Sequence, residues 1–192
     1  MPRKPTFDRE QVIQAALRIA KNEGLSALTV RRVANELRAS VAPIYAHFET
    51  FDDLLQAVVG EILSISQSLY HSQTGPDPFS NIGLASLQFA REYPRIFEEL
   101  VLTRNEYLPD AEELDEGLIQ AMGRDESMRD WSREERRRLL FKMKAMHLGM
   151  AALWATEQAP KWLDKDGAET LLMEVGKELL WAAQARRKGS LT

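Results

Sequence analysis

The most informative pattern in this chain lies in residues 29–48, TVRRVANELRASVAPIYAHF. The apolar residues of its first half have the i, i+3, i+4, i+7 spacing of one helix face and are Val30, Val33, Ala34 and Leu37. Ser40 can cap a second helix, because its hydroxyl can accept a hydrogen bond from an unpaired amide. The inward face of that helix is then expected to hold Ile44, Tyr45 and Phe48. Two short helices joined by a tight turn predict a helix-turn-helix, whose second helix enters the DNA major groove.

Composition limits the class of protein. The chain has 192 residues, of which 44% are hydrophobic and 28% charged, as is ordinary for a globular protein of one or two domains. It has no cysteine, which excludes disulfides, thiolate catalysis and zinc fingers. No apolar run approaches the roughly 18 residues that span a bilayer. The basic N-terminus is not followed by the apolar stretch of a signal peptide, so we expect a cytoplasmic protein.

Charge is divided unevenly along the chain. Residues 1–50 hold eight Lys or Arg and five Asp or Glu, whereas residues 51–192 hold 17 and 24. The net charges are therefore +3 and −7. This asymmetry favours a nucleic-acid surface at the N-terminal end, although a modest imbalance can also arise by chance.

The remaining sequence predicts further helices and no convincing alternating strand. Asp8 and Gln11 form a predicted capping box, which opens a helix that ends at Gly24. Thr50 is the predicted cap of a long helix to about Gln73, with Leu63 on its apolar side. Later helices are predicted from Asp77-Pro78, over residues 95–102, from Pro109-Asp110, from the capping box Ser132–Glu135 to about Gln158, and over residues 165–187.

The first 55 or so residues resemble the DNA-binding domain of the TetR family, the tetracycline-repressor-like transcription factors. The residues that carry this resemblance are Ala15-Ala16-Leu17, Gly24, Thr29-Val30-Arg31, Val33-Ala34, Leu37, Ser40, Ile44-Tyr45, His47-Phe48 and Asp53-Leu54-Leu55. The resemblance implies an all-α fold of about nine helices. Residues 1–52 would form a three-helix DNA-binding domain with the helix-turn-helix, and residues 53–188 a helical ligand-binding and dimerisation domain.

Three residues depart from the family pattern. Arg38 and Ala39 replace the usual Gly-Val, and an arginine enters a tight turn less easily than glycine does. Pro43 lies in the second helix, where it is tolerable within the first turn, at the expected third helical position. Phe51 occupies the position at which the family often has a lysine that contacts phosphate, and phenylalanine has no charge for this contact.

For the DNA-binding surface, the resemblance implies backbone contacts by Tyr45 and His47. The small residues of the second helix would face the bases, so contacts to thymine methyl groups and DNA shape would carry more of the specificity than hydrogen bonds. Thr29 is equally a helix cap, and Lys4 equally a solvated charge. The candidate DNA-binding residues are Lys4, Thr29, Arg31, Arg32, Arg38, Ser40, Val41, Ala42, Pro43, Tyr45, Ala46, His47 and Thr50.

For the C-terminal part, the resemblance implies a small-molecule cavity and a dimer interface on the two final helices. Plain core is the alternative for both sets. The candidate ligand-binding residues are Phe89, Tyr93, Phe97, Leu100, Val101, Arg104, Met122, Phe141, Met146, His147, Met150 and Trp154. The candidate dimer residues are Ala145, Gly149, Ala152, Thr156, Leu172, Val175, Leu179 and Ala183.

We therefore expect a homodimeric repressor that a small, largely apolar molecule releases from a pseudo-palindromic double-stranded DNA operator. Two alternatives remain open at this point. One is a dimeric helical ligand-binding protein without DNA binding, suggested by Arg38 and Phe51. The other, less favoured, is an enzyme, although the chain carries no cofactor motif, no metal-ligand spacing and no nucleophile elbow.

Overall fold

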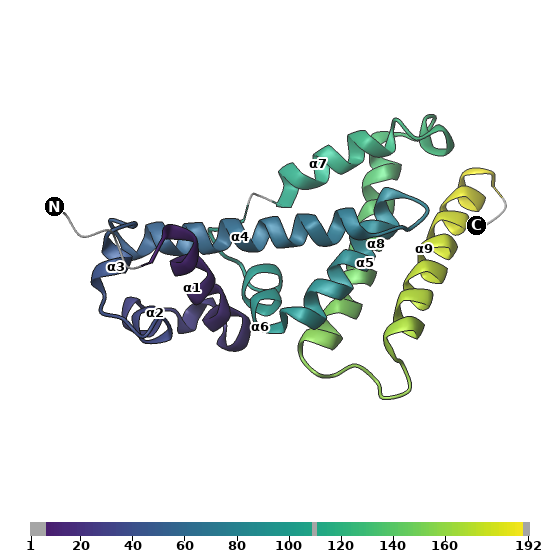
Figure 1. Cartoon of the computed structure of the whole chain (residues 1–192). Coiled ribbons are helices and arrows are strands. Elements are labelled where there is room, and N and C mark those ends of the chain that lie inside the picture. Colours follow the sequence, from purple (N-terminus) through teal and green to yellow (C-terminus); the bar gives the residue numbers. More distant parts are fainter. Residues whose placement is uncertain (1–6, 109–110, 190–192) are drawn as a thin grey trace.

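The computed structural model describes residues 7–108 and 111–189, and these residues form nine α-helices and no strand. The expected all-α fold is therefore confirmed. Within the same residues, no helix combines the length and the apolar character needed to cross a membrane. The chain is elongated, with the N-terminal helices at one end and the final helices at the other (Figure 1).

The N-terminal part contains α1 (Arg9–Glu23), a 3₁₀ turn η1 (Leu25–Ala27), α2 (Val30–Glu36) and α3 (Ala42–Tyr45). The predicted capping box of α1 is present, because Asp8 and Gln11 each accept a hydrogen bond from the other's main-chain amide. Thr29 caps α2 through its hydroxyl, which accepts from the Arg32 amide at 3.2 Å. Local capping thus sets the starts of both helices, as the sequence predicted.

The turn between α2 and α3 differs from the expectation at Ser40. Helix α3 begins after Val41 and has no side-chain cap, so the prediction of a Ser40 cap was wrong. A cap at Ser40 would bond to the amide of the second or third helical residue, and Pro43, at the third position, has no N–H. In the observed helix Pro43 is the second residue and still lies within the first turn. Arg38 adopts φ = 53°, the left-handed conformation that glycine would enter more easily.

Helix α4 (Phe51–Ser72) connects the N-terminal helices with the body of the protein (Figure 1). Its predicted start is confirmed by a capping box between Thr50 and Asp53. With 22 residues it is about 33 Å long. It packs against α1 near its start and against α5 further along, and it buries Leu54, Val58 and Ile62. Leu63, predicted on the same apolar side, is instead 39% exposed, because Ile62 already occupies the inward position.

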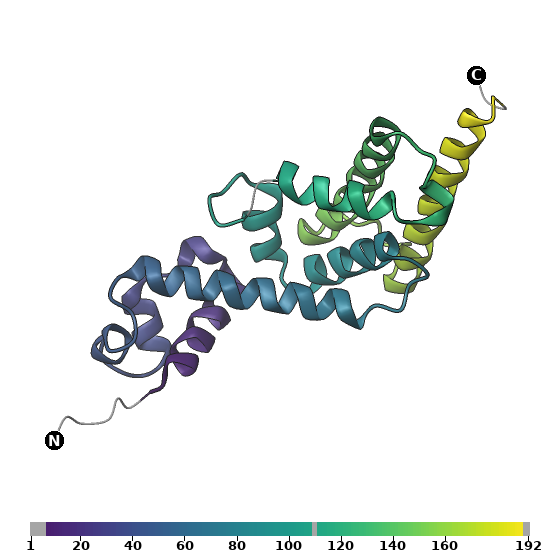
Figure 2. The same cartoon turned by 90° about the horizontal axis from the view of Figure 1, so that it is seen from above.

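The body is built around α5 (Pro78–Glu92), which packs against α4, α8 (Arg133–Ala155) and α9 (Lys165–Arg187). Helix α7 (Ala111–Met122) lies across α8 and is followed by a short turn, η3 (Glu126–Met128) (Figures 1 and 2). The predicted caps Asp77 and Ser132 open α5 and α8. Helix α8 stops at Ala155, slightly before the predicted end. The predicted start at Pro109-Asp110 lies outside the described residues.

A short segment lies between α1 and the body. It consists of α6 (Pro94–Phe97) and a π-helical turn, η2 (Glu98–Leu102), and it packs against α1 through buried Ile96 and Phe97. The carboxylate of Glu99 accepts hydrogen bonds from the amides of Leu25 and Ser26 in η1. The N-terminal helices are therefore held to the body by this segment as well as by α4.

Gly24 is the residue that permits this approach. Its backbone has φ = 94° and ψ = 166°, a region essentially restricted to glycine. A β-carbon at this position would lie 2.5 Å from Oε1 of Glu99. A side chain is thus opposed both by the backbone conformation and by the carboxylate.

We predict that Gly24→Ala lowers the free energy of unfolding by about 2 kcal/mol, because the backbone is strained and Glu99 must move. Urea unfolding followed by circular dichroism measures this change. Gly60→Ala is the matched control, since Gly60 is an exposed residue within α4 whose added β-carbon meets nothing within 4 Å. It should raise stability by about 0.5–1 kcal/mol. Equal effects of the two substitutions would contradict this account of Gly24.

Candidate DNA-binding surface and cavities

One face of the α3 region is exposed and made of small or uncharged side chains. Ile44 and Phe48 point inward and are 1% and 4% exposed. Tyr45 is 54% exposed, so its predicted place on the inward face was wrong. Ile44 and Phe48, one turn apart, fill that face, and Tyr45 lies about 100° around the helix from Ile44. The exposed candidates of this region are Ser40, Val41, Ala42, Tyr45 and Ala46, and Pro43 is half-buried.

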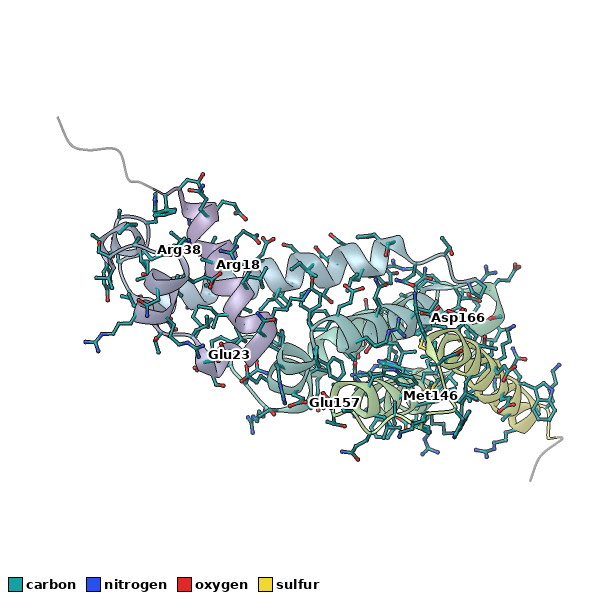
Figure 3. All side chains as sticks on the ribbon, turned by 60° about the horizontal axis from the view of Figure 1, so that its bottom comes forward. Arg18, Glu23, Arg38, Met146, Glu157 and Asp166 are labelled. Atoms are coloured by element: carbon teal, nitrogen blue, oxygen red, sulfur yellow. The ribbon has the colours of Figure 1, made fainter. Side chains whose placement is uncertain are left out.

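Two arginines beside this face are exposed and have no carboxylate partner among residues 7–108 and 111–189. They are Arg31 on α2 and Arg38 in the turn. Figure 3 shows Arg38 at the end of the protein that holds the helix-turn-helix. Arg32, in contrast, pairs with the Glu23 carboxylate and donates to the Ala27 carbonyl at 3.3 Å. Of the three predicted arginines, Arg31 and Arg38 are thus the ones whose charge is open to an outside anion.

Other predicted DNA contacts have structural partners within the chain. The Nε2 atom of half-buried His47 lies 2.8 Å from the Phe7 carbonyl oxygen, and this contact holds the segment before α1. The hydroxyls of Thr29 and Thr50 accept capping hydrogen bonds, although both residues are exposed and their O–H groups can still donate. Phe51 packs against the core. Lys4 lies outside the described residues.

The body contains a largely apolar cavity of about 210 Å³, which we call the first cavity. Helices α5, α7, α8 and α9 and the turn η3 form its wall. Of the predicted ligand-binding residues, Met122, Met146 and His147 line it. Figure 3 places Met146 within the body, on α8. The prediction missed a larger group of lining residues, which includes Phe79, Leu118, Met128, Leu139, Met143, Leu172, Met173 and Leu180.

A second cavity, of about 280 Å³, lies between α4, α5 and the segment that contains α6 and η2. Four predicted residues line this second cavity besides His147: Phe89, Phe97, Leu100 and Val101. Helix α4 contributes Ile62, Leu63, Ser66 and Tyr70, none of which was predicted. Leu63, which is more exposed than predicted, therefore lies in the wall of this second cavity.

His147 on α8 borders both cavities and is 9% exposed. Burial lowers the pKa of its imidazole from 6.5 to about 4, because the charged form loses its hydration. A hydrogen bond to the main chain of Met143 opposes this shift, and the positive charge of Lys144 adds to it. His147 is therefore uncharged near neutral pH.

The other predicted ligand-binding residues line neither cavity. Tyr93 stacks on Phe89, with ring centroids 5.3 Å apart, and receives the ammonium of Lys21 at 4.6 Å from its ring. Met150 and Trp154 pack against the core. Arg104 and Phe141 are exposed, and Phe141 is 71% accessible beside a charged groove. Residue type made all five of them candidates, but only the packed structure separates cavity wall from core and from exposed surface.

The predicted dimer residues divide into some that are exposed and others that pack within a single subunit. Ala145 and Gly149 are exposed on α8 and Thr156 is exposed directly after it, whereas Ala152 and Val175 are half-buried. Leu179 and Ala183 pack within the chain against the cluster that contains Trp131. Leu172 is 4% exposed, and its Cδ2 atom would lie 3.0 Å from a β-carbon at Gly83, so its assignment to a dimer interface was wrong. The close approach of α9 to α5 at Gly83 places Leu172 inside a single subunit.

The part of the chain that the structure describes contains no group of three or more His, Asp or Glu side chains arranged to hold a metal ion. The two candidate sites described above are the exposed α3 face and the pair of cavities.

Comparison with known sequences identifies relatives of the N-terminal part. Residues 12–58 match the family described as bacterial regulatory proteins, tetR family. Over 55 residues, 29% of this chain and 28% of the relative, the chain is 36% identical to the HTH-type nicotine-responsive transcriptional repressor HdnoR of Paenarthrobacter nicotinovorans. Over 65 residues, 34% of this chain and 24% of the relative, it is 34% identical to the HTH-type transcriptional repressor DrrR1 of Streptomyces coeruleorubidus. The chain thus matches about a quarter of the length of these relatives.

Solved structures resemble the whole chain in fold. A substituted TetR protein from Acinetobacter baumannii AYE, in complex with minocycline, is 18% identical, with a TM-score of 0.57 over 95% of this chain and 99% of that one. A TetR-like transcriptional regulator from Rhodococcus sp. RHA1 is 14% identical, with a TM-score of 0.61 over 92% and 94%. At these identities the likeness shows the fold alone. Residues 12–58 therefore match the tetR family of bacterial regulatory proteins by sequence, and the whole chain has the fold of TetR-like regulators.

Proposed function

We propose that the protein is a homodimeric transcriptional repressor that binds a pseudo-palindromic DNA operator and is released by a small, largely apolar molecule. In this proposal residues 1–52 form the DNA-binding domain, and residues 53–188 the ligand-binding and dimerisation domain. The observation that carries it is the exposed face of α3, with Arg31 and Arg38 beside it. Such a face suits the major groove, because small side chains allow close approach to the bases and open cations neutralise phosphates.

The side chains of the α3 face indicate how the DNA would be read. Between Ser40 and His47 the chain has no Arg, Asn or Gln, the side chains that form two hydrogen bonds with one base. Val41, 39% exposed, and Ala46 can instead contact thymine methyl groups. Tyr45, which is exposed, can donate from its hydroxyl to a phosphate. Specificity would then come largely from methyl contacts and from DNA shape.

A dimer is required because one short recognition helix contacts few bases. In the helix-turn-helix family, two half-sites about 34–36 Å apart are read by two copies related by a two-fold axis. The outward side of α8 offers exposed Ala145 and Gly149 and the 40% exposed Leu153, and α9 adds Trp181, which is 65% exposed. Small residues permit close helix approach, and the exposed apolar side chains would be covered by the second copy.

A ligand in either cavity would act on the DNA-binding helices through α4. Residues of α4 line the second cavity, and the same helix packs against α1. Occupancy changes DNA affinity only if the ligand binds one arrangement of the two subunits better than the other. A change in the direction of α4 would alter the distance between the two recognition helices.

Substitution of Arg38 tests the DNA-binding surface. We expect Arg38→Gly to raise the free energy of unfolding by about 1 kcal/mol, because glycine adopts φ = 53° without steric cost. The same substitution should weaken binding to the DNA that flanks the protein's own gene, because a phosphate contact is lost. The slope of the logarithm of the binding constant against the logarithm of the salt concentration should become shallower by about one. Gel-shift titrations at several salt concentrations measure the second effect.

Glu157→Gly is the matched control for Arg38→Gly. Glu157 also has a left-handed backbone, with φ = 57°, but lies after α8, far from α3 (Figure 3). The Glu157→Gly variant should have a higher free energy of unfolding and an unchanged DNA affinity. An Arg38→Gly protein with unaltered affinity and salt dependence would refute the phosphate contact, and a wild-type protein that binds no flanking DNA would refute the proposed regulator.

Substitution of Gly149 tests the dimer. Gly149→Arg should convert the dimer to a monomer at micromolar concentration, because a long charged side chain would separate the two copies of α8. Light scattering gives the mass in solution. Gly60→Arg is the control, since both glycines are helical, exposed and without neighbours within 4 Å of an added β-carbon. A wild-type monomer, or a Gly149→Arg dimer, would contradict this interface.

A further inference from the structure

We infer that the ligand of the two cavities is an uncharged, mostly apolar molecule that carries a hydrogen-bond donor, and that this donor binds the imidazole of His147. The inference rests on the proposed ligand response and specifies its chemistry. His147 is the wall residue that the two cavities share, so a molecule in either cavity, or one that spans both, lies against this residue.

The protonation of His147 determines what it can bind. The ring is uncharged near neutral pH, since burial lowers its pKa to about 4. One ring nitrogen carries the hydrogen and donates it to the main chain of Met143, because the Met143 amide is already bonded within α8 and only its carbonyl oxygen can accept. The other nitrogen is then an acceptor. The group that faces it must therefore be a donor, such as a hydroxyl or an N–H.

The charges around the first cavity disfavour an anionic ligand. Asp77 and Asp125 lie on its wall together with one lysine, Lys177, which is exposed. Hydrogen bonds from Ser127 hold the pKa of the Asp125 carboxyl below its usual value, so this group stays negative. The nearby ammonium of Lys144 is paired with Asp115 at 2.5 Å. A carboxylate ligand would thus meet negative charge and an uncharged imidazole.

The rest of the wall of the first cavity restricts the shape of a ligand only loosely. Five of the seven methionines of the chain line it. Methionine side chains are flexible and polarisable, so they adapt to apolar groups of different outline. The hydrogen bond to His147 is then the fixed point that selects one chemical class among molecules of similar size.

Three probes of similar size test this inference: 1-naphthol, which has a donor, 1-methoxynaphthalene, which does not, and 1-naphthoate, which is anionic. Binding to the full-length protein is measured by calorimetry and by the shift in melting temperature. We expect 1-naphthol to bind at least about tenfold more tightly than the methoxy compound, because a buried acceptor is otherwise left unpaired. The anion should bind most weakly.

His147→Leu should remove the difference between 1-naphthol and 1-methoxynaphthalene, whereas His71→Leu, at an exposed position of α4, should preserve it. The comparison within the wild-type protein stands even if His147→Leu does not fold. Equal binding of the two compounds by the wild type, binding of none of the three, or a difference that persists in His147→Leu would overturn the inference. If the protein selects 1-naphthol through His147 but its DNA affinity does not change when 1-naphthol is bound, this inference stands. The proposal that the ligand releases the protein from DNA would then be refuted.

A separate set of contacts carries a second inference, on how the cavity affects the DNA-binding helices. The Glu99 carboxylate accepts from the amides of Leu25 and Ser26, the second at 3.3 Å, and from the Ser26 hydroxyl at 2.6 Å. The next two residues of η2, Leu100 and Val101, line the second cavity. We propose that Glu99 transmits occupancy of that cavity to η1, which leads directly into α2.

The geometry of this contact makes it sensitive to small displacements. Charged hydrogen bonds are strong but directional, and three donors meet one carboxylate here. The turn η2 is π-helical, an irregularity that often marks functional positions in helices. Asn105 holds the turn through a hydrogen bond from its side-chain amide to the Leu100 carbonyl at 2.8 Å. A ligand that moves Leu100 therefore also moves the carboxylate that holds the start of the helix-turn-helix.

The test compares DNA affinity with and without saturating 1-naphthol in two neighbouring variants. In the wild type and in Glu98→Ala, 1-naphthol should lower DNA affinity at least about tenfold, within the usual range of coupling between sites. In Glu99→Ala the change should fall below about twofold, while 1-naphthol still binds. Hydrogen exchange at the amides of Leu25 and Ser26 provides an independent readout and should be faster in Glu99→Ala. A full response in Glu99→Ala would overturn only this role of Glu99, whereas no response in the wild type would overturn the ligand response as well.

Discussion

The rest of the structure depends on the burial of one side of α4 along most of its length. Leu54, Leu55 and Val58 of its first half are buried together with the residues of α1, and Ile62 is buried in the same continuous core further along. That core extends through α5 and α6 to α8 and α9. Because a 22-residue helix is stiff, the two ends of the protein cannot move independently as long as this side stays buried.

Glu99 adds a second connection of a different kind. The contacts of α4 are apolar and distributed along a helix, whereas those of Glu99 are polar and concentrated on two residues of η1. Apolar contacts tolerate small sliding motions, but directional hydrogen bonds weaken steeply when their geometry changes. Gly24 makes the second connection possible, since a side chain there would occupy the space of the carboxylate. The N-terminal helices are thus connected to the body by a stiff helix, α4, and by the hydrogen bonds of Glu99, which can be broken.

The DNA-binding end and the cavities differ in how they would select their partners. The α3 face is small and exposed and has no Arg, Asn or Gln, which favours shape and methyl contacts. The cavities are apolar, with an uncharged histidine between them. In both places a few polar groups fix position while apolar surface supplies most of the contact. Arg38 accepts a strained backbone conformation at the point where its charge faces outward, an arrangement that is common at functional positions.

The sequence by itself determined where most helices begin and which family residues 12–58 resemble, because the signals involved are local. Asp8, Thr29, Thr50, Asp77 and Ser132 each cap a helix through amides no more than three residues away, so each start could be predicted from its neighbours. The same local reasoning predicted that Arg38 would be unfavourable in its turn. It was wrong at Ser40, because the missing N–H of Pro43 removes a partner that the cap would use.

Only the tertiary structure decided which side of each helix faces the core, a cavity, another helix or solvent. Periodicity identified apolar faces, but it could not show that Leu172 packs at Gly83 inside one subunit or that Leu63 borders a cavity. Tyr45 is exposed because Ile44 in α3 and Phe48 just after this helix already fill the inward side. The shared position of His147 and the contact of Glu99 with η1 join segments far apart in sequence. Such pairings depend on how complete helices pack, which no local pattern of residues encodes.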